Sequence, residues 1–148
     1  LFKKFLDHQK SEIVNLYIFD TFGSGDTRNK VVDIFIKNII AGNPISIPSN
    51  EIRINLSDVE PLCRSLIKSI DLPQGSYSVK SPDTISLEDL MKIIMDISNK
   101  KVDILKVTTG SNYFDEIEIF PENIFLEDPS YNLRDSIKKR IKELEDGI

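Results

Sequence analysis

The chain has 148 residues, a formal net charge of −5, one cysteine and one histidine. With 40% hydrophobic and 29% charged residues it can bury a core, and its composition is not that of a disordered chain. Its acidic balance, without a basic block, argues against nucleic-acid binding and against adhesion to anionic membranes. No apolar run approaches the roughly 20 residues that span a bilayer. A single cysteine and a single histidine predict no internal disulfide and no metal site, and we expect a cytoplasmic protein.

The first part of the chain predicts a helix tail, a buried strand and a second helix. Residues 1–10 have helical spacing but no N-cap, and 13–19 form a nearly continuous apolar run. Such a run is typical of a strand covered on both faces in a parallel sheet. A turn-rich loop at 20–29 then leads into a helix at 30–40, which Gly42 ends. The missing cap and the need for covering elements lead us to expect further sequence upstream.

The rest of the chain continues this alternation, which is typical of a mixed α/β fold with a small sheet and about five helices. Ser57 with Glu60, and Ser86, are predicted helix N-caps. Cys63 lies on an apolar helix side and is expected in the core. The basic run Lys138–Arg140 is expected on a solvated helix face. The predicted strands are 44–48, 52–56, 75–80, 102–107 and 115–120, and the predicted helices are 57–70, 86–97 and 133–144.

The loop from Gly23 to Arg28 is the one candidate site that the residues themselves indicate. A dinucleotide fingerprint would need glycine where Arg28 stands, so that motif fails. Two glycines and an arginine can still hold an anion, since exposed amides and a guanidinium suit phosphate. The alternative is a tight turn with a solvated arginine. No catalytic constellation is found, because His8 is placed on a helix surface.

Four segments in matching order resemble the extended short-chain dehydrogenase/reductases, the NAD(P)-dependent epimerase/dehydratase family. The resemblance covers residues 1–107, and Phe19–Gly23 is most similar to the branch that includes CDP-abequose and CDP-paratose synthases. Those enzymes reduce a 4-keto sugar nucleotide. The segments, with the family patterns they resemble, are Leu16–Asp26 (Leu-Arg-Leu-Phe-Asn-Val-Tyr-Gly-Pro-Gly-Asp), Arg53–Val59 (Arg-Ile-His-Val-Asp-Asp-Val), Gly75–Val79 (Tyr-Asn-Val-Gly) and Thr84–Leu90 (Ile-Ser-Leu-Lys-Glu-Leu).

The resemblance implies the C-terminal portion of a Rossmann-type enzyme, with residues 1–148 as a single substrate-binding domain. The N-terminal dinucleotide-binding domain is expected to lie outside this sequence, because no tyrosine here has a lysine four residues later and no glycine-rich first turn is found. This half would bind a nucleotide sugar next to NAD or NADP in an intact epimerase, dehydratase or reductase. The isolated chain is expected to be inactive. Its expected partners are the missing half, the nucleotide-sugar substrate and, in some relatives, a second copy in a homodimer.

By the same resemblance, Phe19 lies beside the nicotinamide, and Asp20 stands where many members place asparagine against the substrate diphosphate. Arg28 and Arg53 are the implied substrate contacts, through charge-assisted bonds to phosphate. A longer family pattern puts Glu51, in place of Arg53, at the arginine position. No catalytic residue is predicted in this chain. The alternative is a non-catalytic interaction or structural domain that keeps only the fold.

Overall fold

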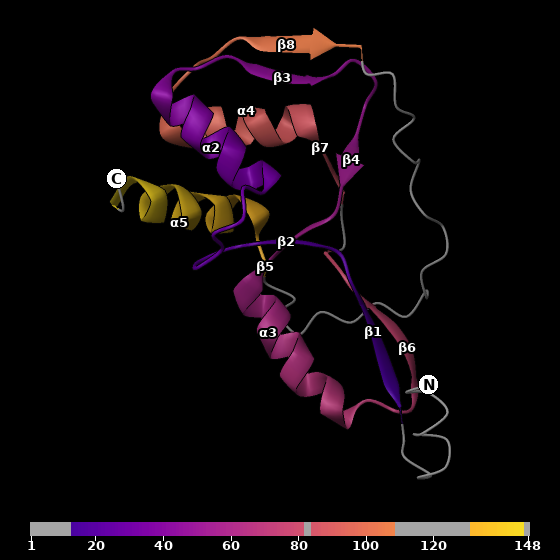
Figure 1. Ribbon diagram of the computed structural model, residues 1–148. Helices are drawn as coiled ribbons and strands as arrows, with labels where there is room; N and C mark the ends of the chain where they lie inside the picture. The colour runs from indigo at the N-terminus through magenta and orange to yellow at the C-terminus, as the bar shows by residue number, and fades with distance from the viewer. Residues whose placement is uncertain (1–12, 82–83, 109–130, 147–148) are drawn as a thin grey trace.

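The computed structural model describes residues 13–81, 84–108 and 131–146 (Figure 1). The predicted elements at 1–10 and 115–120, and His8, lie outside the described residues. The described helices are α2 (Val31–Ala41), α3 (Val59–Lys68), α4 (Leu87–Ser98) and α5 (Leu133–Asp146), with a 3₁₀ turn, η1 (Ser69–Asp71). The described strands are β1 (Val14–Ile18), β2 (Asp20–Phe22), β3 (Ile45–Pro48), β4 (Arg53–Ile54), β5 (Leu56–Asp58), β6 (Gly75–Val79), β7 (Ile85–Ser86) and β8 (Ile104–Val107).

The described strands form four pairs, three of them parallel. β1 pairs with β6, β2 with β5 and β3 with β8 in parallel, whereas β4 and β7 are antiparallel. Parallel strands need crossover connections, and helices supply them: α2 lies between β2 and β5 in the chain, and α3 lies between β1 and β6. The predicted α/β class with a small mixed sheet is therefore confirmed.

The hydrophobic core lies among α2, α4 and α5, with β3 beside it (Figure 1). Burying one such aliphatic side chain contributes about 1.5–3 kcal/mol, so this cluster is the main source of stability in the described chain. The helices predicted at 30–40, 86–97 and 133–144 supply most of the residues of this cluster. The fully buried large side chains are Ile36, Ile39, Leu90, Met91, Ile94 and Ile137.

The ends of α2 and α4 follow from the local sequence. The Ser86 hydroxyl accepts a hydrogen bond from the Asp89 amide at 3.0 Å, as its N-cap position predicts. Gly42 ends α2 with a φ of 74°, in the left-handed region that favours glycine. Asn99 ends α4 in the same way, with a φ of 51°. Both helix predictions are confirmed.

The start of α3 differs from the prediction. The Asp58 carboxylate, and not the Ser57 hydroxyl, accepts the amide of Glu60 at 2.9 Å. The reason is the pairing of β2 with β5, which runs to the Phe22–Asp58 register and keeps Ser57 inside the strand. The predicted strand at 52–56 is likewise divided into β4 and β5, because Asn55 leaves the strand pattern between them.

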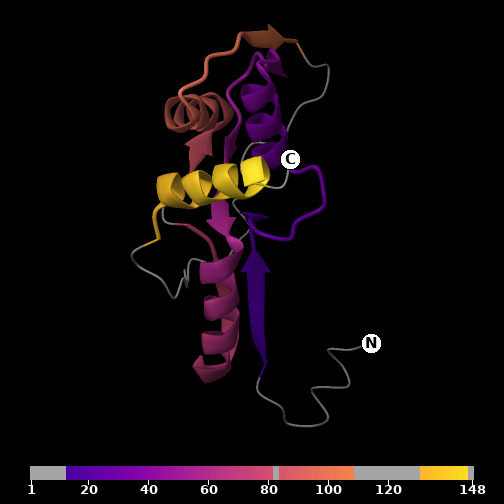
Figure 2. The ribbon, with the colours of Figure 1, turned by 90° about the vertical axis from the view of Figure 1, so that its left-hand side faces the viewer.

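The β1–β6 pair and α3 extend away from the core, on the side opposite β3 and β8 (Figures 1 and 2). Ile67 and Ile70 on α3 and η1 are 67% and 81% exposed, and Cys63 is also exposed, so its predicted place in the core is wrong. Tyr17 and Ile18 of β1 are 41% and 47% exposed. The prediction of a strand covered on both faces is wrong for the described chain, because three of the five residues of β1 are exposed.

Candidate functional site

The loop from Gly23 to Arg28 follows β2 at the carboxyl end of a parallel strand pair, the edge where α/β proteins bind ligands. Gly23 has a φ of 149°, and a Cβ atom there would lie 2.5 Å from Val59 Cγ1, so only glycine fits. The chain therefore turns tightly against the start of α3. An open hollow of about 330 Å³ results, lined by residues 21–28 and Val59.

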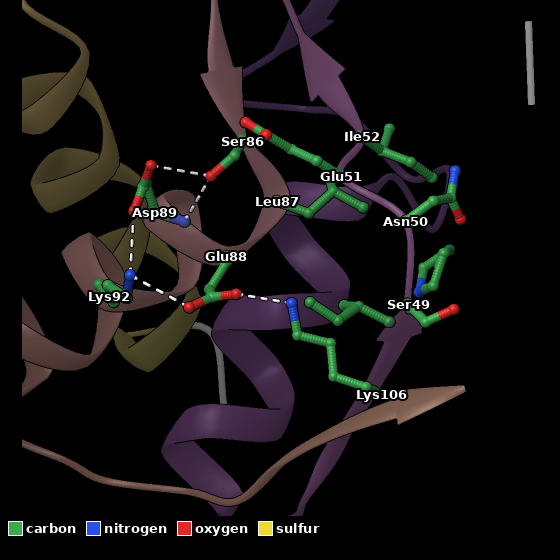
Figure 3. A pocket seen from close by; sticks show the side chains of 12 residues that line it. Ser49, Asn50, Glu51, Ile52, Ser86, Leu87, Glu88, Asp89, Lys92 and Lys106 are labelled. Carbon is green, nitrogen blue, oxygen red and sulfur yellow. Dashed lines mark hydrogen bonds and ion pairs between the residues drawn. The ribbon is translucent and has the colours of Figure 1, made fainter. Parts of the chain in front are cut away.

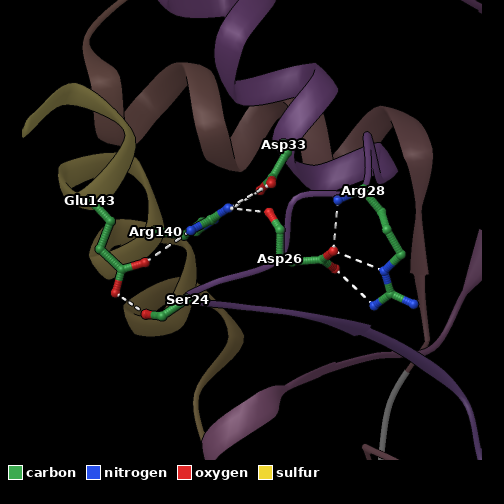
Figure 4. A network of polar contacts seen from close by, with 6 residues as sticks. All are labelled: Ser24, Asp26, Arg28, Asp33, Arg140 and Glu143. Carbon is green, nitrogen blue, oxygen red and sulfur yellow. Dashed lines mark hydrogen bonds and ion pairs between the residues drawn. The ribbon is translucent and has the colours of Figure 1, made fainter. Parts of the chain in front are cut away.

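Arg28 lines this hollow and is held by Asp26 (Figure 4). Its Nε lies 2.9 Å from Asp26 Oδ1, and its Nη2 lies 3.0 Å from Oδ2. These hydrogen bonds lower the pKa of Asp26 from 3.8 to about 2. The side chain of Arg28 is 68% exposed, and its Nη1 donates to nothing within the described residues. An anion in the hollow can therefore accept hydrogen bonds from the free N–H groups of Arg28, although Asp26 already neutralises the charge of this guanidinium.

Arg53 lies elsewhere, on β4. Its Nε donates to Thr84 Oγ1 at 3.1 Å, and its Nη2 donates to the Thr84 carbonyl at 2.9 Å. Its Nη1 donates to Glu51 at 2.9 Å, so the two residues that compete for the family's arginine position contact each other. Because Arg53 already donates to three acceptor atoms, it has fewer free donors for a ligand than Arg28 has. Arg53 therefore joins β4 to the segment before β7.

Phe19 and Asp20 lie where β1 ends and β2 begins. Phe19 follows β1 and is half-buried, and Asp20 begins β2 and is exposed. The ammonium of Lys80 lies 5.4 Å from the centre of the Phe19 ring, within the range of a cation–π contact. Lys80 follows β6, so the carboxyl ends of β1 and β6 meet at this contact. Sequence reasoning did not single out Lys80.

A second hollow, of about 320 Å³, lies between the β3–β4 connection and the start of α4 (Figure 3). Glu88 lies between Lys106 Nζ at 2.6 Å and Lys92 Nζ at 3.2 Å, and these hydrogen bonds lower the pKa of Glu88. Of the four predicted site residues, only Arg28 lines either hollow. Neither of these two hollows therefore contains both Arg28 and Arg53.

Arg140 is the largest departure from the sequence prediction near the loop. It was placed on a solvated helix face, but it is 7% exposed. Its Nε and Nη2 lie 2.9 and 2.6 Å from the two oxygens of Asp33, which is itself buried in the first turn of α2 (Figure 4). A buried carboxylate draws the guanidinium inward, since neither charge is stable there alone.

Residues 13–81, 84–108 and 131–146 contain neither a group of metal-ligating side chains nor a helix that could span a membrane. Among them, no cluster of three or more histidine, cysteine, aspartate or glutamate side chains is arranged to hold a metal ion. No described helix has the length and apolar character that crossing a bilayer requires.

The fold is similar to those of two solved UDP-glucose 4-epimerases and of RMD. UDP-glucose 4-epimerase of Thermus thermophilus, in complex with NAD, matches 99% of this chain with a TM-score of 0.76 and 13% identity. The Thermotoga maritima UDP-glucose 4-epimerase with UDP-glucose matches 99% with a TM-score of 0.77 and 14% identity. RMD from Pseudomonas aeruginosa, complexed with NADPH, matches 98% with a TM-score of 0.77 and 11% identity.

This chain spans about half the length of those proteins: 51%, 50% and 52% respectively. No family model and no curated protein matches the sequence. At these identities the likeness shows the fold, which is that of the C-terminal half of Rossmann-type epimerases.

Proposed function

We propose that this chain is the substrate-binding part of an NAD(P)-dependent nucleotide-sugar epimerase, dehydratase or reductase. The observation that supports this most is the match of 98–99% of the chain to half of three solved proteins whose structures contain NAD, UDP-glucose or NADPH. A shared arrangement of strands and helices over the whole chain is a strong reason to expect a shared ligand edge. The candidate loop lies at that edge.

In this proposal Arg28 binds the diphosphate of the nucleotide-sugar substrate. The guanidinium edge that Asp26 leaves free can donate two hydrogen bonds to phosphate oxygens, and Asp26 holds the side chain in one orientation meanwhile. Less orientational entropy is then lost on binding. Phe19 would lie beside the nicotinamide, which supplies the hydride chemistry when NAD(P) is bound. Asp20 and Arg53 are proposed further contacts for the same substrate.

The proposed partner is a dinucleotide-binding half. Its surface here is the apolar side of α3 and η1 together with the exposed face of β1, where Ile67, Ile70 and Ile18 are uncovered. Strands of that half that pair with β1 would extend the parallel β1–β6 pair into a larger sheet, the arrangement in which such apolar strands are normally found. The neighbouring proteins are about twice as long as this chain, which leaves room for such a half. A Tyr-x-x-x-Lys pair and a glycine fingerprint encoded upstream of Leu1 would be expected.

The finer assignment is to the branch of CDP-abequose and CDP-paratose synthases, which reduce 4-keto sugar nucleotides. It depends on the segment Phe19–Gly23. Competition between CDP and UDP for the chain measures this directly. A preference for CDP supports the branch, and a preference for UDP contradicts it.

The test of the proposed function is isothermal titration of the full chain with UDP-glucose and CDP-glucose. We expect saturable binding that Arg28→Ala weakens about tenfold, since a charge-assisted hydrogen bond contributes about 1.5–3 kcal/mol. The control is Arg134→Ala, because Arg134 is an exposed arginine of α5 that pairs with Asp96. Equal loss in both variants, or turnover by the chain alone with NAD(P)H, would contradict the proposal.

A non-catalytic domain is the second candidate, and a specific observation favours it. Both candidate arginines are already paired with carboxylates, Arg28 with Asp26 and Arg53 with Glu51. A phosphate that bound either arginine would have to approach a positive charge that a neighbouring carboxylate already neutralises. This candidate expects no binding of either nucleotide sugar in the same titration, together with a normally folded chain.

A further inference from the structure

Helix α5 reaches the candidate loop through two side chains, Arg140 and Glu143 (Figure 4). The guanidinium of Arg140 contacts three groups: Asp33 at 2.6 and 2.9 Å, the carbonyl oxygen of Asp26 at 3.4 Å, and Glu143 at 3.2 Å. The Ser24 hydroxyl in turn donates to the other oxygen of Glu143. Arg140 and Glu143 therefore contact the loop at two of its residues, Ser24 and Asp26.

These contacts fix the part of the loop from which Arg28 projects. The backbone of Asp26 meets Arg140, while its side chain holds Arg28 on the other side. Asp26 is therefore held between two arginines, one buried and one exposed. If Asp26 moves, the orientation of Arg28 changes with it.

Arg140 also cancels a charge that would oppose an anion. Asp33 stands in the first turn of α2, immediately after the loop, and only 4% of its side chain is exposed. An unpaired buried carboxylate there would repel a phosphate at the loop, since low-dielectric surroundings screen it poorly. The two-point contact with Arg140 makes the pair neutral.

We propose that Arg140 is a positioning residue for the anion-binding loop: it fixes Asp26, and through it Arg28, and neutralises Asp33 beside the bound phosphate. This inference rests on the proposed function, since it assumes that the loop binds a nucleotide diphosphate. Arg140 itself is buried and does not touch the ligand. Its effect passes through Asp26 to Arg28.

The test replaces the pair as a unit, because Arg140→Met alone would leave Asp33 buried and unpaired. The double variant Asp33→Leu/Arg140→Met exchanges a buried ion pair for hydrophobic side chains, a change that folded proteins often tolerate. The matched control is Asp96→Leu/Arg134→Met, which removes an exposed ion pair between α4 and the same helix. Arg140→Lys keeps the positive charge but loses the two-point contact with Asp33, so it tests whether the charge alone is enough to hold the loop in place.

Two measurements on the full chain decide the matter: amide hydrogen exchange, and titration with UDP. In the Asp33/Arg140 double variant we expect the amides of residues 23–28 to exchange about tenfold faster, with α4 nearly unchanged. We also expect UDP affinity to fall about fivefold, with a smaller loss in Arg140→Lys and none in the control. If exchange rises equally in α4, or the loop is unchanged in a folded double variant, the proposal is wrong. Absence of both UDP and CDP binding by the unmutated chain would contradict the proposed function, whereas the exchange result would still decide whether Arg140 fixes the loop.

Discussion

Asp26 holds Arg28 through two parallel hydrogen bonds, from Nε to Oδ1 at 2.9 Å and from Nη2 to Oδ2 at 3.0 Å. The same carboxylate accepts the Arg28 amide at 3.0 Å. A side chain that bonds the amide two residues on forms a local turn typical of aspartate. Asp26 therefore orients the Arg28 side chain within the loop itself, in the absence of a ligand.

Arg28→Ala should raise the pKa of Asp26 from about 2 towards its ordinary value, because the side-chain hydrogen bonds from Arg28 are the largest cause of its lowering, while the backbone amide of residue 28 still donates to Asp26. Since the folded-state pKa is lowered, the stabilisation is present above the ordinary pKa. It is lost as pH falls from about 4 towards 2. Carboxyl titration by NMR measures this pKa, and Arg53→Ala serves as the control. An unchanged pKa in Arg28→Ala would show that the contact is not formed in solution.

Two isoleucines should differ sharply in their contributions to stability. Ile94 of α4 is fully buried, so Ile94→Ala should cost about 2–5 kcal/mol of unfolding free energy. Ile70 is 81% exposed, so Ile70→Ala should change it by less than about 0.5 kcal/mol. Urea unfolding of the isolated chain measures both values. A large cost at Ile70 would mean that the chain already covers its apolar α3 side, by itself or as a dimer.

The helices around the core were predictable because their signals are local. α4 has a serine cap, apolar residues at helical spacing and an end residue suited to the left-handed conformation, all within 14 residues of sequence. α2 similarly ends at Gly42. Each of these signals acts through neighbours in the chain, so periodicity and capping suffice to find them.

The predictions that were wrong concern residues whose burial depends on partners distant in sequence. Arg140 looks solvated within its basic run, and its partner Asp33 lies 107 positions away. The apolar composition of β1 and α3 indicates burial, but burial also needs a covering element, and Ile18 of β1 and Ile67 of α3 remain exposed in the described chain. In the candidate site, the loop and Arg28 could be found from residue types, whereas the contact of Arg53 with Thr84 carries no local signal.

Asn55 should be one of the costliest polar side chains to remove. Its side-chain nitrogen donates to the Ser81 carbonyl at 2.9 Å, and its side-chain oxygen accepts the Ser81 amide at 2.9 Å. The side chain of Asn55 therefore makes the two hydrogen bonds that a neighbouring strand would otherwise make with Ser81. Asn55→Ala would leave both buried backbone groups unpaired, at a cost of about 2–4 kcal/mol. The exposed Asn43→Ala is the matched control in thermal or urea unfolding. Equal, small effects of the two substitutions would contradict the contact.

Tyr131 links the segment before α5 to β5, and it should make stability sensitive to alkaline pH. Its hydroxyl donates to the Leu56 carbonyl at 3.2 Å, and burial, aided by the charge of Asp58, raises its pKa above the ordinary value of 10.0. A tyrosine that stays neutral in the folded state ionises first in the unfolded chain. The stabilisation is therefore complete below pH 10 and decreases above it, by about 1.4 kcal/mol per pH unit.

Urea unfolding between pH 8 and 11 tests this with Tyr131→Phe. At pH 8 the variant should be about 1 kcal/mol less stable, because the Leu56 carbonyl loses one donor. As pH rises above 10, the difference should shrink, since phenylalanine has no proton to lose. Tyr77→Phe, which removes an exposed hydroxyl bonded to the Pro73 carbonyl, should keep the pH dependence of the unmutated chain. Parallel pH profiles for the unmutated chain and Tyr131→Phe would show that the Tyr131 hydroxyl is not buried against β5.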